Sequence, residues 1–163
     1  MKVKDLEIPR YRWRVRVFFP VTRYNIDAIM CALEDINCPE HILNRVYDNL
    51  CSGKIDTGFT YSNLRMRSTV MVIGMTSSPA EFLNSFEHEL RHFVDDVAKT
   101  MDIDLTGEKV AYLTGDINLY LWTDIHDFIC CCKKKEIAMD NLDVSNLHED
   151  IPDYEFEVRK HSL

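Results

Sequence analysis

The chain has 163 residues, of which 46% are hydrophobic and 28% are charged, and its formal net charge is −8. This length and composition are those of a globular domain with a sizeable core, and they exclude a disordered or fibrous chain. The acidic balance disfavours a general nucleic-acid binder. No long apolar run predicts a membrane span, and no basic, apolar start predicts export.

The distribution of charge and cysteine refines this expectation. Residues 1–23 carry seven Lys or Arg and two acids, whereas residues 140–163 carry seven acids and two Lys or Arg. We therefore expect one domain over residues 1–163, with residues 140–163 as an acidic C-terminal segment. Three of the six cysteines are consecutive, which suits neither a disulfide framework nor a metal site. Reduced thiols and a cytoplasmic protein are the expectation.

The first patterned segment, residues 10–19, alternates with period two and predicts a half-buried strand. Its apolar face comprises Tyr11, Trp13, Val15 and Val17, and its other face comprises Arg10, Arg12, Arg14 and Arg16. The arginine row allows two interpretations: contact with phosphates, or a solvated sheet face paired with acids. The acidic net charge favours the second.

Two helices are predicted next. An apolar stripe over residues 26–36, preceded by Asn25 as the N-cap, indicates the first. Pro39 opens a second, shorter helix, which Gly53 terminates. Both helices have the pattern of core scaffolding.

Two strands follow. Residues 59–61 and 65–73 flank a turn near residues 62–63. The second run becomes continuously apolar at residues 70–73, as is typical of a buried strand. An exposed edge of such a sheet can accept an extended peptide by strand addition, unless every strand is paired internally.

A long helix is predicted after residue 78. Ser78 is placed as its N-cap, Pro79 as its first residue and Glu81 as its third, which is a strong helix start. Apolar residues then recur at helical spacing: Phe82, Phe86, Leu90, Phe93, Val94 and Val97.

This helix carries the sequence His-Glu-x-x-His at residues 88–92. Residues i and i+4 lie on one helical face, so His88 and His92 can direct both imidazoles at one zinc ion. Glu89 could then act as general base toward a metal-bound water. The non-functional alternative is a surface helix that carries two histidines and a glutamate by chance.

A catalytic zinc usually has three protein ligands and a water. After a short connector, a second long helix is predicted from Glu108 to about residue 128. A plain antiparallel hairpin would place Asp116 nearer to His92 than Glu108. For Glu108 to reach the metal, the connector must run back about 12 Å, which an extended segment can span. Both acids are therefore candidates.

These residues resemble the signature of zincin metallopeptidases, in which a strand precedes the motif helix and a third ligand follows it. The run from Glu108 to Gly115 is similar to the glutamate-bearing helix of gluzincins, and more closely to that of small mobile-element and phage zincin-like proteins. The resemblance implies Glu108 as the third ligand, with Asp116 as the fallback or as a residue that orients a ligand. Tyr112 on this helix is a candidate donor to a developing oxyanion.

The chain departs from these families in three places. Leu90 and Arg91 stand where zincins usually carry two uncharged residues, so the helix must be solvated or ion-paired beside Arg91. The spacing between His92 and Glu108 is short, and Tyr112 stands where larger gluzincins have Asp. A weaker resemblance to the ImmA/IrrE metallopeptidases lacks that family's downstream motif.

We therefore predict an α+β fold, with a small, mostly antiparallel sheet packed against helices and the motif helix followed by a second long helix. The predicted function is that of a zinc-dependent metallohydrolase, above all a peptidase, acting on a peptide or protein substrate. Neither a membrane nor a nucleic acid is an expected partner, and a homodimer is left open. The alternative is a catalytically inactive zincin-like module that binds a protein.

The last prediction concerns residues 153–158, where acids alternate with Tyr154, Phe156 and Val158. This pattern predicts a strand beside residues 10–18 of the same chain or of a symmetry-related copy, with acids against the arginine row. The alternative is a solvated acidic tail.

Overall fold

The computed structural model describes residues 1–22, 25–53 and 58–130. The elements, in chain order, are β1 (Lys2–Ile8), the 3-10 turn η1 (Pro9–Tyr11), β2 (Trp13–Val21), α1 (Ile26–Asp35), α2 (Glu40–Ser52), β3 (Gly58–Asn63), β4 (Ser68–Gly74), α3 (Pro79–Thr100) and α4 (Glu108–Ile129). Four strands and four α-helices confirm the predicted α+β class. No helix among these residues is long and apolar enough to cross a bilayer.

The four strands form one sheet in the order β1-β2-β4-β3. The pairs β1–β2 and β3–β4 are antiparallel, which agrees with the predicted, mostly antiparallel sheet, whereas β2 and β4 run parallel. Strand β1 was not predicted, although its residues alternate between the two faces of the sheet. The predicted strand over residues 10–19 begins later, at Trp13, because Pro9 opens η1 and Arg12 ends it in the left-handed conformation.

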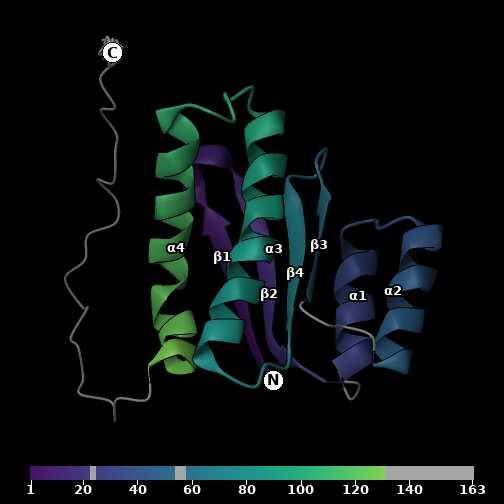
Figure 1. Cartoon of the computed structure of the whole chain (residues 1–163). Helices are drawn as coiled ribbons and strands as arrows, with labels where there is room; N and C mark the ends of the chain where they lie inside the picture. Colours follow the sequence, from purple (N-terminus) through teal and green to yellow (C-terminus); the bar gives the residue numbers. More distant parts are fainter. Residues whose placement is uncertain (23–24, 54–57, 131–163) are drawn as a thin grey trace, which may run out of the picture. The chain divides into compact units, whose positions relative to one another are not determined.

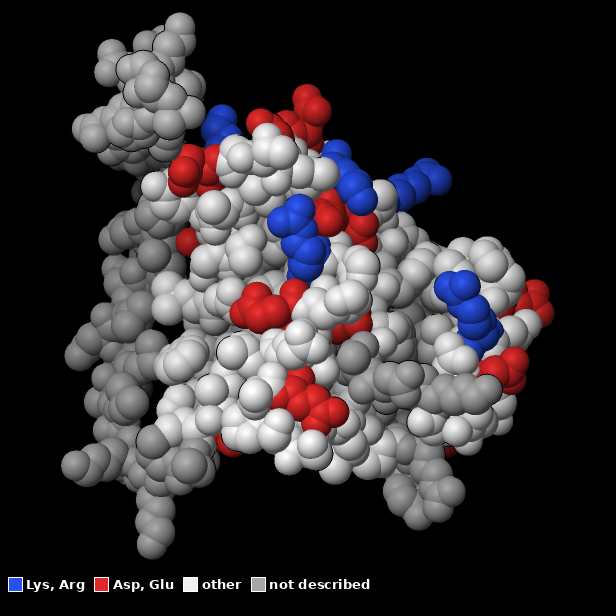
Figure 2. All heavy atoms as spheres, viewed as in Figure 1, with Lys and Arg blue, Asp and Glu red and all other residues white. Residues whose placement is uncertain are grey.

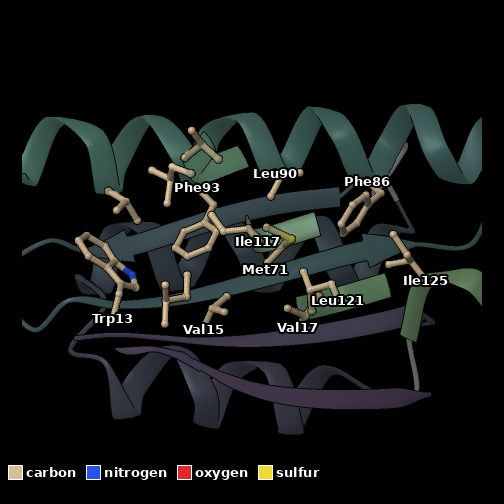
Figure 3. Close-up of a cluster of buried hydrophobic side chains, with 14 of the residues drawn as sticks. Trp13, Val15, Val17, Met71, Phe86, Leu90, Phe93, Ile117, Leu121 and Ile125 are labelled. Atoms are coloured by element: carbon tan, nitrogen blue, oxygen red, sulfur yellow. The ribbon is translucent and has the colours of Figure 1, made fainter. Parts of the chain in front are cut away.

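Helices cover both faces of the sheet (Figure 1). On one face, α3 and α4 pack over Trp13, Val15 and Val17 of β2 (Figure 3). On the other, α1 and α2 pack over Phe18 of β2 and Val70 and Val72 of β4. Alternate residues of the central strands therefore enter two separate cores, and this explains why Val70–Ile73 is apolar without interruption.

The predicted helix boundaries are confirmed, with one difference in capping. Ser78 Oγ accepts a hydrogen bond from the Glu81 backbone N–H at 3.2 Å, and Gly53 ends α2 with φ +68°. Asn25 precedes α1 but does not cap it, because its side-chain oxygen accepts from Thr22 instead. The turn between β3 and β4 lies at residues 64–67, slightly later than predicted.

Strand β2 has β1 on one side and β4 on the other, so both of its edges are paired. The acidic segment over residues 140–163, with the strand predicted at residues 153–158, lies outside the described residues. Cys31, Cys38 and Cys51 are free thiols, as expected, but Cys130 is disulfide-bonded, contrary to expectation.

Candidate metal centre

The two histidines of the motif lie on the solvent side of α3. His88 and His92 are both exposed, and their rings lie edge to face with centroids 4.9 Å apart. The two Nε2 atoms are 3.2 Å apart. Zinc–nitrogen bonds of the usual length place two tetrahedral ligand atoms about 3.3 Å apart, so this spacing fits two positions of one zinc ion. Between neutral rings, the same distance allows one Nε2–H to donate to the other Nε2.

Glu89, by contrast, is directed at the sheet, and its relative exposure is 2%. The hydroxyl of Thr60 on β3 lies 2.8 Å from Glu89 Oε2 and 3.1 Å from the Glu89 carbonyl oxygen. The hydroxyl has one hydrogen, which goes to the carboxylate when Glu89 is ionised. Thr60 thus fixes the carboxylate at the contact between α3 and the last strand of the sheet.

Burial raises the pKa of Glu89 above its ordinary value. The Thr60 hydrogen bond and the charges of His88 and His92 act in the opposite direction and are smaller. Since both imidazoles influence the carboxylate, the three motif side chains form one electrostatic unit. A carboxyl group with a raised pKa beside two metal-type ligands is the arrangement that general acid–base chemistry requires.

Small residues of β3 make room for Glu89. A Cβ added to Gly58 would lie 3.1 Å from Glu89 Cγ and 2.1 Å from the Val72 carbonyl oxygen, so only glycine fits there. Period two places Thr60 and Ser62 on the same side of β3 as Gly58. The sequence predicted this strand, and the alternation Gly-x-Thr-x-Ser was the signal that its face admits a polar side chain.

The structure does not bring a third metal ligand to the pair. Across the described ranges 1–22, 25–53 and 58–130, no three His, Cys, Asp or Glu side chains are grouped so that they could hold a metal ion. Glu108 is exposed at the first position of α4, beyond the end of α3. Glu108 is therefore not grouped with His88 and His92 in this arrangement, and its role as third ligand stays a prediction.

The two other candidates, Asp116 and Tyr112, lie in the first half of α4 and are partly buried. Burial is the main cause that raises the pKa of Tyr11, and the charge of Asp116 raises it further. The Asp116 carboxylate therefore lies within electrostatic reach of Tyr11, at the turn between β1 and β2. The roles of Asp116 and Tyr112 stay predictions.

Arg91 lies on the solvent side of α3, and its Nε is 2.9 Å from Asp95 Oδ1. This ion pair confirms that the charged residue inside the motif is accommodated without disturbing the histidines.

Models of known protein families, curated proteins and solved structures were compared with the chain, and none of them matches it.

Proposed function

We propose that this protein is a zinc-dependent metallohydrolase whose substrate is a peptide or protein, with His88 and His92 as metal ligands and Glu89 as general base. The observation that carries the proposal is the 3.2 Å separation of the two Nε2 atoms beside a buried glutamate with a raised pKa. The proposal places the protein in the cytoplasm, which accords with its three free thiols but not with the disulfide at Cys130.

A bound zinc would polarise the scissile carbonyl and make a bound water acidic. Glu89 would accept the proton of that water and later pass it to the leaving amine. Thr60 would hold the carboxylate in one position through both transfers, and burial would raise the pKa of the Glu89 carboxyl group. Glu108 stays a predicted third ligand that would have to approach from α4, with Asp116 as the alternative.

The sheet edge supports a peptide as the substrate. Strand β3 is the last strand of the sheet and pairs only with β4 among the described residues. Its Thr60 contacts Glu89, so the edge that could accept an extended peptide passes directly beside the candidate centre. A peptide added to this edge would place its backbone carbonyls next to α3.

A second candidate function is favoured because no third ligand joins His88 and His92 among the described residues. A zincin-like module without catalysis would need only the scaffold and the sheet edge, and would bind a protein segment without cleaving it. The hydrogen bond that engages Glu89 with Thr60 is equally compatible with a structural glutamate.

Zinc content measured on protein purified without a polyhistidine tag separates the two. We expect about one zinc per chain in the unmodified protein, and loss of zinc in His88→Ala and His92→Ala, because too few ligands would remain. His41→Ala, which removes an exposed histidine from α2, is the matched control and should keep the metal. Zinc retained after both motif substitutions would end the proposal.

Hydrolysis of a mixed peptide library tests the roles. Glu89→Gln should keep zinc and abolish cleavage, because the amide cannot accept the proton. Glu108→Ala should weaken zinc binding more than Asp116→Ala. A protein that binds zinc but cleaves nothing, with or without Glu89, would favour the binding module.

A further inference from the structure

Five arginines gather at one end of the sheet, in a surface that we call the arginine corner: Arg10, Arg12, Arg14, Arg65 and Arg67. They come from two turns that are far apart in the sequence, the one before β2 and the one between β3 and β4. Figure 1 shows both turns at the end of the sheet where α3 finishes and α4 begins.

Contacts between the two turns make the corner continuous. The Arg14 backbone N–H donates to the Arg67 carbonyl oxygen at 2.9 Å, and Arg67 Nη1 lies 3.4 Å from the Tyr11 carbonyl oxygen. The Arg10 guanidinium lies 5.8 Å from the centre of the Tyr11 ring. The two turns are therefore in direct contact through Arg14, Arg67 and the Tyr11 carbonyl group.

Four of the five arginines have no ion-pair partner among the described residues. Among the described residues, Arg12, Arg14, Arg65 and Arg67 form no ion pair with a carboxylate, although the chain has 27 acids and 19 Lys or Arg. Arg16, two residues further along β2, is paired with Asp5 at 2.6 Å. On the face that α3 and α4 cover, both signs of charge are interspersed (Figure 2). Like charges that lie close together without ion pairs repel one another and lower the stability of the fold. The arginines are therefore better explained by a role in binding than by a role in folding.

The backbone conformation at two of these arginines also indicates a role other than folding. Arg12 and Arg67 adopt left-handed conformations, with φ of 49° and 50°. The other left-handed positions hold Asn37, Gly53 and Asp102, the residue types that tolerate this region. At the two corner positions, arginine occupies sites where glycine would be less strained.

A recess of about 430 Å³ lies beside the corner, between the start of β2 and helix α1. Arg14, Arg16 and Ser68 line it, and Arg14 Nη2 lies 3.4 Å from Ser68 Oγ. Asp5, Glu7 and Asp35 line it as well, so its interior does not favour a carboxylate. An acidic ligand would therefore be bound by the arginines of the two turns and not inside the recess.

We propose that the arginine corner is a docking surface for an acidic segment of a partner polypeptide. The chemistry is charge complementarity with glutamate and aspartate carboxylates. An acidic segment and a nucleic acid are both anionic, so neither the net charge of −8 nor the acids that border the corner, Asp5, Glu7 and Asp35, distinguishes them, whereas their length does. A phosphate backbone needs a longer basic track than these two turns provide. The inference rests on neither zinc nor hydrolysis.

Fluorescence anisotropy at low salt tests it, with a labelled glutamate-rich peptide as the probe. The protein should bind this peptide, should not bind the version in which every Glu is Gln, and should lose affinity as salt is added. The double variant Arg12→Gly/Arg67→Gly should bind about tenfold more weakly, since two charge-assisted contacts are removed. Its melting temperature should not fall, because glycine suits both backbone positions.

Two controls make the result specific. Asn37→Gly changes another left-handed position without removing charge, and Arg45→Gln removes an exposed arginine from α2. Both should bind as the unmodified protein does, whereas Arg14→Gln should weaken binding. Equal weakening in Arg45→Gln, or no binding by the unmodified protein, would overturn the proposal. Tighter binding of an oligothymidylate than of the peptide would reassign the corner to nucleic acid.

Discussion

Glu89 and the arginine corner place charge in opposite ways. Glu89 carries one acidic group into a buried position, where a single threonine hydroxyl satisfies it and burial raises its pKa. The corner leaves several basic groups in solvent without a carboxylate partner among the described residues. A buried polar group must be matched within the fold, whereas an exposed unmatched charge is free to be matched by another molecule. The buried arrangement suits a group that takes part in proton transfer, and the exposed arrangement suits the binding of a charged partner.

The largest effect should come from closing the space that Glu89 uses. Gly58→Ala would bring a Cβ against the Val72 carbonyl oxygen, and backbone cannot yield as a side chain does. We expect a loss of about 3 kcal/mol in the free energy of unfolding, measured by urea denaturation.

Gly115→Ala is the matched control, because a Cβ there meets nothing within 4 Å and the position is helical. It should raise stability by about 0.5–1 kcal/mol. Equal effects of the two substitutions would show that β3 does not approach β4 and α3 as closely as described.

A smaller effect should come from removing the partner of Glu89. Thr60→Val keeps the shape of the side chain but leaves the buried carboxyl group without its donor. The expected loss is about 1–2 kcal/mol, measured by urea denaturation of the metal-free protein. Thr60→Ser keeps the hydroxyl and should lose less. If the Thr60→Val and Thr60→Ser variants are equally stable, the hydrogen bond between Thr60 and Glu89 does not contribute to stability in solution.

The smallest effect should distinguish the paired arginine of β2 from its unpaired neighbour. Arg16 makes two contacts with Asp5, at 2.6 and 3.2 Å, so Arg16→Gln should cost about 0.5 kcal/mol at low salt and less at high salt. Arg14→Gln should be neutral or slightly stabilising, because it removes like-charge repulsion without breaking an ion pair. A larger cost for Arg14 than for Arg16 would mean that the corner is satisfied within the protein.

The sequence predicted local structure well because local patterns determine it. The caps at Ser78 and Gly53 and the apolar spacing of α3 each depend on residues within a few positions of one another. Strand β1 was missed because Lys4, Asp5 and Glu7 interrupt its apolar pattern, and its pairing with β2 is what makes it a strand.

The candidate site was predictable only in part for the same reason. The spacing of His88 and His92 is a local property of one helix, and the structure bears out that the two rings share a face. The partner of Glu89 comes from Thr60, 29 residues away, and only the packing of α3 on β3 brings them together. The apolar spacing of α4 indicates which of its faces is buried, but not which residues of α3 lie opposite Glu108 and Asp116, because that depends on the packing of the two helices.

The sheet order has a consequence for how the chain folds. The described elements form four consecutive hairpins, β1–β2, α1–α2, β3–β4 and α3–α4, each made of neighbours in the sequence. Only the parallel pairing of β2 with β4 joins the two β-hairpins into one sheet. It brings Arg14 beside Ser68, and the chain segment between them, which contains α1, α2 and β3, forms a long closed loop in the polymer sense. Closing that loop costs chain entropy before any contact across it is gained. The hairpins can therefore form early and independently, and the docking of β2 on β4 should be the step that commits the chain to its native state.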